Sequence, residues 1–186
     1  MSLPSPLKRS SEFPRCTAAA AVQTWVSPGR SFSTPAFWNN SLYYFGVIFG
    51  STQPGEQYTF NTSTGQFNTT PIKTAVGLGF PGATPSVSSN GTSNGVLWAL
   101  DTGSYGTNDS RSGSAGPAVL HAYSATDINS ELWNSNQGTG NAAGFAVKFA
   151  VPTVANGKVY IGTRGNDNTN GSGTVFGELD VYGLLP

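Results

Sequence analysis

A run of alternating oxygen-bearing side chains near the C-terminus could bind a metal ion. Asn166, Asn168 and Asn170 alternate, Gly171 is the sixth residue counted from Asn166, and Glu178 is the thirteenth. Calcium loops place oxygen ligands at alternate positions, a glycine at the sixth position and a bidentate glutamate at the twelfth. The spacing to Glu178 is one residue too long, and asparagine replaces two of the expected acids. These residues are a candidate for weak calcium binding, and a solvated hairpin loop is the alternative.

Asp101 begins the sequence Asp-Thr-Gly-Ser directly after an apolar stretch, which matches the active-site signature of aspartic proteases. That chemistry requires two carboxylates that share one proton across a water molecule. The chain has no second Asp-Thr-Gly, so only a homodimer could assemble the pair. The structural alternative is an Asx turn, which aspartate favours at the start of a loop. We expect this turn at Asp101.

The remaining chemistry-bearing residues give no catalytic constellation. His121 is the only histidine and lies on an expected strand, and no Gly-x-Ser-x-Gly elbow surrounds a candidate serine, so we expect a half-buried structural histidine. Asp127 and Glu131 are the nearest pair of acids for a hydrolytic site, but they lie in an expected turn. The tryptophans and tyrosines are expected in the core, whereas an exposed aromatic row on one face would indicate a sugar-stacking platform. We assign no catalytic and no cofactor-binding residue.

The composition excludes several function classes. Nine basic and nine acidic residues give a formal net charge of zero, which excludes nucleic-acid binding driven by counterion release. A single cysteine, Cys16, excludes an internal disulfide, a cysteine-based zinc site and an iron–sulfur cluster. No stretch approaches 18 apolar residues, so we expect no membrane span.

The elements that must position any site are predicted to be strands. The chain has 24 glycines and 12 prolines, which interrupt it too often for helices longer than about two turns. Short alternating or apolar runs recur instead, bounded by Asn-Gly, Gly-Ser and Pro-Gly. The pattern predicts an all-β protein with strands at residues 41–49, 57–61, 95–100, 119–123, 145–151, 158–162 and 178–182.

One unit occurs three times along the chain. After Pro35, Pro85 and Pro152 the sequence runs from a small residue through an apolar residue and a turn to an apolar and an aromatic residue. Proline suits the start of a strand, and Asn-Gly suits a tight hairpin turn. A later strand with a tyrosine or phenylalanine follows each copy. Repeats of this length with three or four strands are typical of β-propeller blades.

The third copy, from Pro152 to Thr163, closely resembles the inner hairpin of the quinoprotein-type (PQQ-like) β-propeller repeat. The motif that links blades in that family is degenerate here, with Asn61 at its aspartate position. The body also resembles the C-terminal part of large exported bacterial proteins. The resemblance implies a partial β-propeller of about three blades. It implies no bound PQQ, because the quinone cage needs a complete propeller, calcium ligands and often paired cysteines.

The expected organisation is a flexible tail at 1–30 followed by repeats at about 31–80, 81–144 and 145–186. Residues 22–26 could supply a ring-closing strand, and open sheet edges could support a homodimer. Few lysines, many Asn, Gly, Ser and Thr residues and large aromatics suit an extracellular or periplasmic protein.

The expected function is a non-catalytic scaffold or interaction module that binds a protein or a glycan through blade loops such as 101–117 and 163–174. A carbohydrate-binding or hydrolytic domain is the first alternative. A degenerate quinone-linked oxidoreductase is the second. We expect no cofactor, and calcium is the one ion left open.

Overall fold

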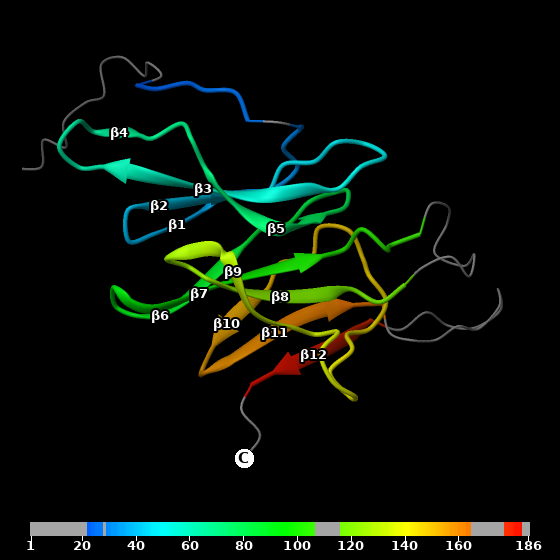
Figure 1. Cartoon of the computed structure of the whole chain (residues 1–186). Helices are drawn as coiled ribbons and strands as arrows, with labels where there is room; N and C mark the ends of the chain where they lie inside the picture. Colours follow the sequence, from blue (N-terminus) through cyan, green and yellow to red (C-terminus); the bar gives the residue numbers. More distant parts are fainter. Residues whose placement is uncertain (1–21, 28, 107–115, 165–176, 184–186) are drawn as a thin grey trace, which may run out of the picture.

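The computed structural model describes residues 22–27, 29–106, 116–164 and 177–183. Within these ranges the chain is all-β, as predicted, and its strands form three antiparallel sheets. The sheets follow one another along the chain and lie stacked in that order, the second between the first and the third (Figure 1). The described sheets do not close into a ring. In these ranges there is no helix with the length and apolarity needed to cross a membrane.

The first sheet contains a hairpin, a long third strand and a divided outer edge. Asn39 and Asn40 form the hairpin turn with φ values of 44° and 60°. Asparagine tolerates this left-handed region, so the pair suits a two-residue turn. The third strand pairs with the hairpin on one side and with two shorter strands on the other. The strands are β1 (Ala36–Trp38), β2 (Ser41–Tyr44), β3 (Gln53–Asn61), β4 (Gln66–Phe67) and β5 (Ile72–Leu78).

The second and third sheets are sequential meanders, each starting with a hairpin as the repeat predicts. The hairpin of the third sheet turns through Asn156 and Gly157, with φ values of 51° and 69°. The second sheet has the order β6 (Ser86–Asn90), β7 (Ser93–Asp101), β8 (Val119–Ser124) and β9 (Asp127–Asn134). The third has the order β10 (Thr153–Ala155), β11 (Lys158–Thr163) and β12 (Glu178–Tyr182).

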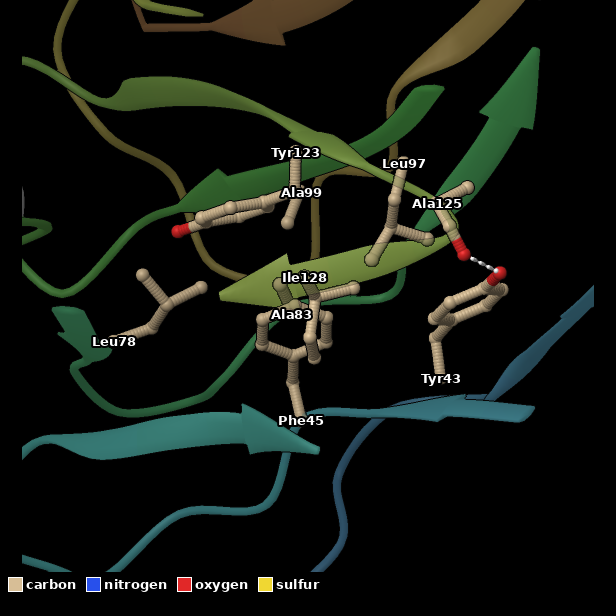
Figure 2. Close-up of a cluster of buried hydrophobic side chains, with 9 residues drawn as sticks. All are labelled: Tyr43, Phe45, Leu78, Ala83, Leu97, Ala99, Tyr123, Ala125 and Ile128. Carbon is tan, nitrogen blue, oxygen red and sulfur yellow. Dashed lines mark hydrogen bonds between the residues drawn. The ribbon is translucent and has the colours of Figure 1, made fainter. Parts of the chain in front are cut away.

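A first hydrophobic core fills the space between the first and second sheets (Figure 2). Tyr43 and Phe45 enter it from the first sheet and meet Leu97, Tyr123 and Ile128 of the second. The Tyr43 hydroxyl donates a hydrogen bond of 2.5 Å to the Ala125 carbonyl, drawn as a dashed line in Figure 2. Packing and this buried hydrogen bond together fix how the two sheets face each other.

The Gln57 side chain makes a second polar connection between these sheets. Its Nε2 donates to the Ala125 and Thr126 carbonyls at 3.4 and 3.3 Å, and its Oε1 accepts from the Ile128 N–H at 3.2 Å. A buried amide that is satisfied at both ends stabilises one arrangement of the sheets over its alternatives.

A second hydrophobic core lies between the second and third sheets. Leu100 and Leu120 of the second sheet pack with Val159 and Ile161 of the third. Trp98, Trp133 and Tyr182 are half-buried against this core, in agreement with the predicted packing role of the tryptophans. The two cores make the second sheet the central layer of the molecule.

The meander topology divides the connections between two ends of the stack. The tight hairpin turns lie at one end, which we call the turn end. The longer β2–β3, β5–β6, β7–β8 and β9–β10 connections leave the opposite end, which we call the loop end. In Figure 1 the β2–β3 and β7–β8 connections leave the sheets on the right side of the view. At the loop end, the β2–β3, β5–β6 and β7–β8 connections therefore lie next to one another.

Most predicted strands are confirmed, but residues 145–151 do not form one. Phe145 makes only an isolated bridge to Pro117, and Phe149 has a φ of 66° within a turn. Ala146 is buried in the second core, whereas Phe149 is 60% exposed. Single apolar side chains such as Ala146 anchor this segment as a loop. A sequence pattern of apolar residues does not distinguish such a loop from a strand. The strand predicted at 41–49 is shorter and ends at Tyr44.

Residues 22–27 lie against the first sheet and form no strand. The Gln23 side chain bonds to both the N–H and the carbonyl of Phe67. Trp25 packs on Tyr58 at 5.2 Å and on Phe67 at 5.6 Å between ring centroids. The structure therefore places the expected ring-closing segment on the first sheet, and in the described residues β12 pairs only with β11.

Candidate functional site

The β2–β3, β5–β6 and β7–β8 connections border an open pocket of about 530 Å³ at the loop end of the first two sheets. This volume is typical of small-molecule sites, roughly 300–1,000 Å³. Glycine and serine dominate the lining, so backbone polar groups lie within reach of a ligand. The lining residues are Gly50, Ser51, Thr52, Gly79, Phe80, Gly103, Ser104, Tyr105 and Gly106.

The Asp101 carboxylate holds two walls of this pocket together. Its Oδ1 accepts a hydrogen bond of 2.8 Å from the Gly103 N–H and a longer one of 3.4 Å from the Gly79 N–H. The first bond is the predicted Asx turn, and the second connects the β7–β8 loop to the β5–β6 loop. Asp101 is thus a positioning residue, and its carboxylate is engaged by backbone donors.

Four aromatic side chains form a cluster beside the pocket, which we call the aromatic cluster. Phe80 lies at its centre, with ring centroids 4.9 Å from Phe49, 5.3 Å from Phe32 and 5.9 Å from Tyr105. Phe32 is 42% and Phe49 53% exposed. Phe80 and Tyr105 also line the pocket. An exposed apolar group of this kind beside a pocket indicates a binding surface.

Two cationic side chains lie on the rings of the aromatic cluster. The Lys148 Nζ is 4.1 Å from the Tyr105 ring centroid and 5.6 Å from that of Phe80. The Arg30 guanidinium lies 4.9 Å from the Phe49 centroid. Neither cation forms an ion pair with a carboxylate of the described residues. Two cations therefore lie beside the pocket on the aromatic cluster, while the Asp101 carboxylate lies between its walls.

A buried polar group lies between the first two sheets, on the same face of the second sheet as Asp101. His121 is 5% exposed, its Nδ1 is 2.6 Å from Glu131 Oε1, and its ring stacks on Tyr123 at 5.7 Å. Burial raises the pKa of the Tyr123 phenol, and the negative charges of Glu131 and Asp101 add to this. His121 itself is buried, and not half-buried as predicted; its structural role stays a prediction.

Two buried hydroxyl groups have no hydrogen-bond partner among the described residues. They belong to Thr102, directly after Asp101, and to Tyr123. An unpaired buried hydroxyl costs free energy relative to its hydrated state.

The acids considered for hydrolysis are not brought together. The sequence pattern predicts a turn at Asp127 and Glu131, but both residues lie on strand β9. The Asp127 Oδ1 accepts from the Asn129 N–H, while Glu131 faces His121. Neither lines the pocket at the loop end.

The calcium-loop candidate falls largely outside the described residues, which do not include Asn166, Asn168 and Asn170. Glu178 is described, begins β12 and is exposed. No group of three metal-ligating side chains occurs in the described part of the chain. Calcium binding at these residues stays a prediction.

Sequence reasoning did not identify the aromatic cluster or its cations. Phe80 stands in Phe-Pro-Gly, which reads only as a turn, and Lys148 lies in the run expected to be a strand. Their neighbours in space come from connections that are far apart in the sequence.

Comparisons with known proteins find no match for this chain among family models, curated proteins or solved structures. The site must therefore be interpreted from its own chemistry.

Proposed function

We propose that the chain is a non-catalytic binding module of an exported protein, in which the three sheets serve as blades of a partial β-propeller and the loop end holds the ligand. The blade interpretation is supported by the repeated meander, by face-to-face packing of successive sheets and by contacts of β6 with both β1 and β10, the first strands of the neighbouring sheets.

The observation that carries the binding role is the pocket lined by Phe80 and Tyr105. Rigid sheets hold the loops on either side of it, and exposed rings continue its apolar wall. Concave sites with apolar walls and a few placed polar groups are the common form of ligand sites. Asp101 supports a non-catalytic role, because its Oδ1 is taken up by backbone N–H groups.

The ligand class that fits best is a carbohydrate with a carboxylate group. A sugar ring has an apolar C–H face that stacks on aromatic rings and hydroxyl groups that bond to Ser51, Thr52 and the glycine backbones. Lys148 and Arg30 would attract the carboxylate, since both cations lack an ion-pair partner among the described residues.

Isothermal titration with a uronic-acid oligosaccharide and with its neutral counterpart tests this proposal. We expect the acidic sugar to bind more tightly, and Phe80→Ala and Tyr105→Ala to weaken binding about tenfold, as loss of roughly 1.4 kcal/mol of ring contact would do. Phe37→Ala is the matched control, because Phe37 is 56% exposed but lies on β1 and lines none of the pockets described here. Absence of binding, or equal binding by all three variants, would contradict the proposal.

A further inference from the structure

In all three hairpins the first residue of the first strand pairs with an aromatic residue, so positions can be compared from that pair, although β6–β7 has a register shift nearer its turn. Tyr43 pairs with Ala36 and Tyr160 with Thr153, the first residues of β1 and β10. In the second sheet Trp98 pairs with Ser86, the first residue of β6. Tyr43, Trp98 and Tyr160 therefore occupy equivalent positions.

The first two of these residues face the next sheet of the stack. Tyr43 is fully buried in the core with the second sheet and bonds to Ala125 there. Trp98 is packed against the core with the third sheet. We call this face of each sheet its forward face.

The residue before each aromatic points the opposite way. Leu97 enters the core with the first sheet, and Val159 enters the core with the second sheet. This is the rear face of each sheet. Both interfaces of the stack thus bring a forward face onto a rear face.

The forward face of the third sheet lacks such a cover in the described residues. Tyr160 pairs there with Val181, and Leu179 pairs with Gly162 on the same face. Leu179 is 65% and Val181 50% exposed. Gln57 of the first sheet is equivalent to Val181, because it pairs with Tyr43 as Val181 pairs with Tyr160. Gln57 is buried by the second sheet.

Among the described residues, the segment 22–27 covers the rear face of the first sheet, and no neighbouring sheet does. Between that segment and the sheet lies a hollow of about 240 Å³, lined by Trp25, Ser27, Leu42, Tyr44 and Tyr58. Leu42 holds the position of Leu97 and Val159, which are buried in their cores. The hollow around it is lined mainly by aromatic rings, and Ser27 and the Tyr58 hydroxyl donate to the buried Glu56 carboxylate.

We propose that two copies of the chain associate front to back, with the Leu179–Val181 face of one third sheet against the aromatic hollow of the other copy's first sheet. The argument is continuity: the described residues leave one forward and one rear face without a neighbouring sheet, and every interface observed joins these two types. Projecting aliphatic side chains meet a hollow of matching character, which buries apolar surface on both sides. Because the two surfaces differ, the contact is heterologous.

Sedimentation equilibrium over a wide concentration range tests this association. The wild-type mass should rise from monomer to dimer or beyond, and Leu179→Asp should hold the chain at the monomer mass. Leu132→Asp is the matched control, because Leu132 is 55% exposed but belongs to the second sheet, both faces of which are covered. Val181→Asp should repeat the effect of Leu179→Asp, and circular dichroism checks that each variant keeps its β-structure.

Mixing two variants separates this contact from any symmetric one. Leu179→Asp has an intact rear face, and Tyr44→Arg has an intact forward face. Each alone should be monomeric, whereas an equimolar mixture should form a dimer through the one remaining front-to-back contact. A wild type that stays monomeric at every concentration, an association that Leu179→Asp leaves unchanged, or a mixture that stays monomeric would each overturn the proposal.

Discussion

Gly79 and Gly103 pack backbone against backbone at the loop end: a Cβ built on Gly79 would lie 3.0 Å from the Gly103 Cα, and a Cβ on Gly103 equally close to the Gly79 Cα. The contact joins the β5–β6 and β7–β8 connections, and Asp101 Oδ1 accepts hydrogen bonds from both residues. The shape of the pocket thus depends on two positions where any side chain would have to displace the opposing backbone.

Gly79→Ala should move the two loops apart and weaken ligand binding. The added methyl group meets backbone, which cannot rotate away, so a reduction of about tenfold or more in affinity is expected with a small loss of stability. Calorimetric titration measures it. Gly162→Ala is the matched control, because a Cβ there meets nothing within 4 Å. Unchanged affinity in Gly79→Ala would show that this wall does not form the site.

Lys148→Met should reduce the preference for acidic over neutral sugars while retaining stacking, because Arg30 keeps its charge. Methionine preserves most of the contact with Tyr105 and Phe80, but it removes the positive charge that lies 4.1 Å from the Tyr105 ring. Wild-type affinity for the acidic sugar should fall as salt rises, and the variant should show a weaker dependence because only Arg30 remains. Equal salt dependence in both proteins would place the charge recognition elsewhere.

Thr102 and Thr163 offer a matched pair of buried threonines. Thr163 is 4% exposed and donates from Oγ1 to Asp180 at 3.1 Å, whereas Thr102 is 1% exposed and its hydroxyl has no partner among the described residues. Thr163→Val should lower the free energy of unfolding by about 1–3 kcal/mol, and Thr102→Val should leave it unchanged or raise it. Urea unfolding compares them. Equal losses would mean that the Thr102 hydroxyl is satisfied in solution.

Stability should fall at alkaline pH through the buried Tyr43 and the half-buried Tyr182. Burial raises the pKa of Tyr43 and of Tyr182 from 10.0 to about 12, with the charge of Asp180 adding at Tyr182. The folded state therefore holds these protons more tightly than the unfolded state. Their contribution is complete below pH 10 and is lost as the pH rises from about 10 to about 12.

Tyrosinate absorbance followed together with circular dichroism checks the alkaline transition. The buried tyrosines should ionise only as the chain unfolds, and Tyr182→Phe should shift the transition to higher pH. Ionisation of all tyrosines near pH 10 without unfolding would contradict the burial observed here.

The strands and hairpins were predictable because their causes are local. Asn39–Asn40 and Asn156–Gly157 favour the φ values of their turns, and short alternating or apolar runs predicted the strands at 95–100, 119–123, 158–162 and 178–182. The prediction of a strand at residues 145–151 was wrong. An apolar run indicates that a segment is buried, and here the buried segment is a loop and not a strand. The strand β4 has two residues and exists because it pairs with β3. Two residues are too few to show an alternating pattern, so the sequence did not predict this strand.

The site was predictable only in part. The Asx turn at Asp101 is a local preference, and it was foreseen. The aromatic cluster depends on Phe32, Phe49, Phe80 and Tyr105, which come from different connections and meet only when the sheets stack. No spacing along the chain encodes that meeting, because it depends on the packing angle between sheets.

Mapping of backbone amide shifts by NMR tests the proposed binding site most directly. On titration with the uronic-acid oligosaccharide, the amides of Gly79, Gly103, Ser104 and Tyr105 should shift in a saturable way, while those of the β10–β11 turn at Asn156 and Gly157 should not. A titration that leaves the loop-end amides unmoved, or that moves another surface instead, would contradict the account.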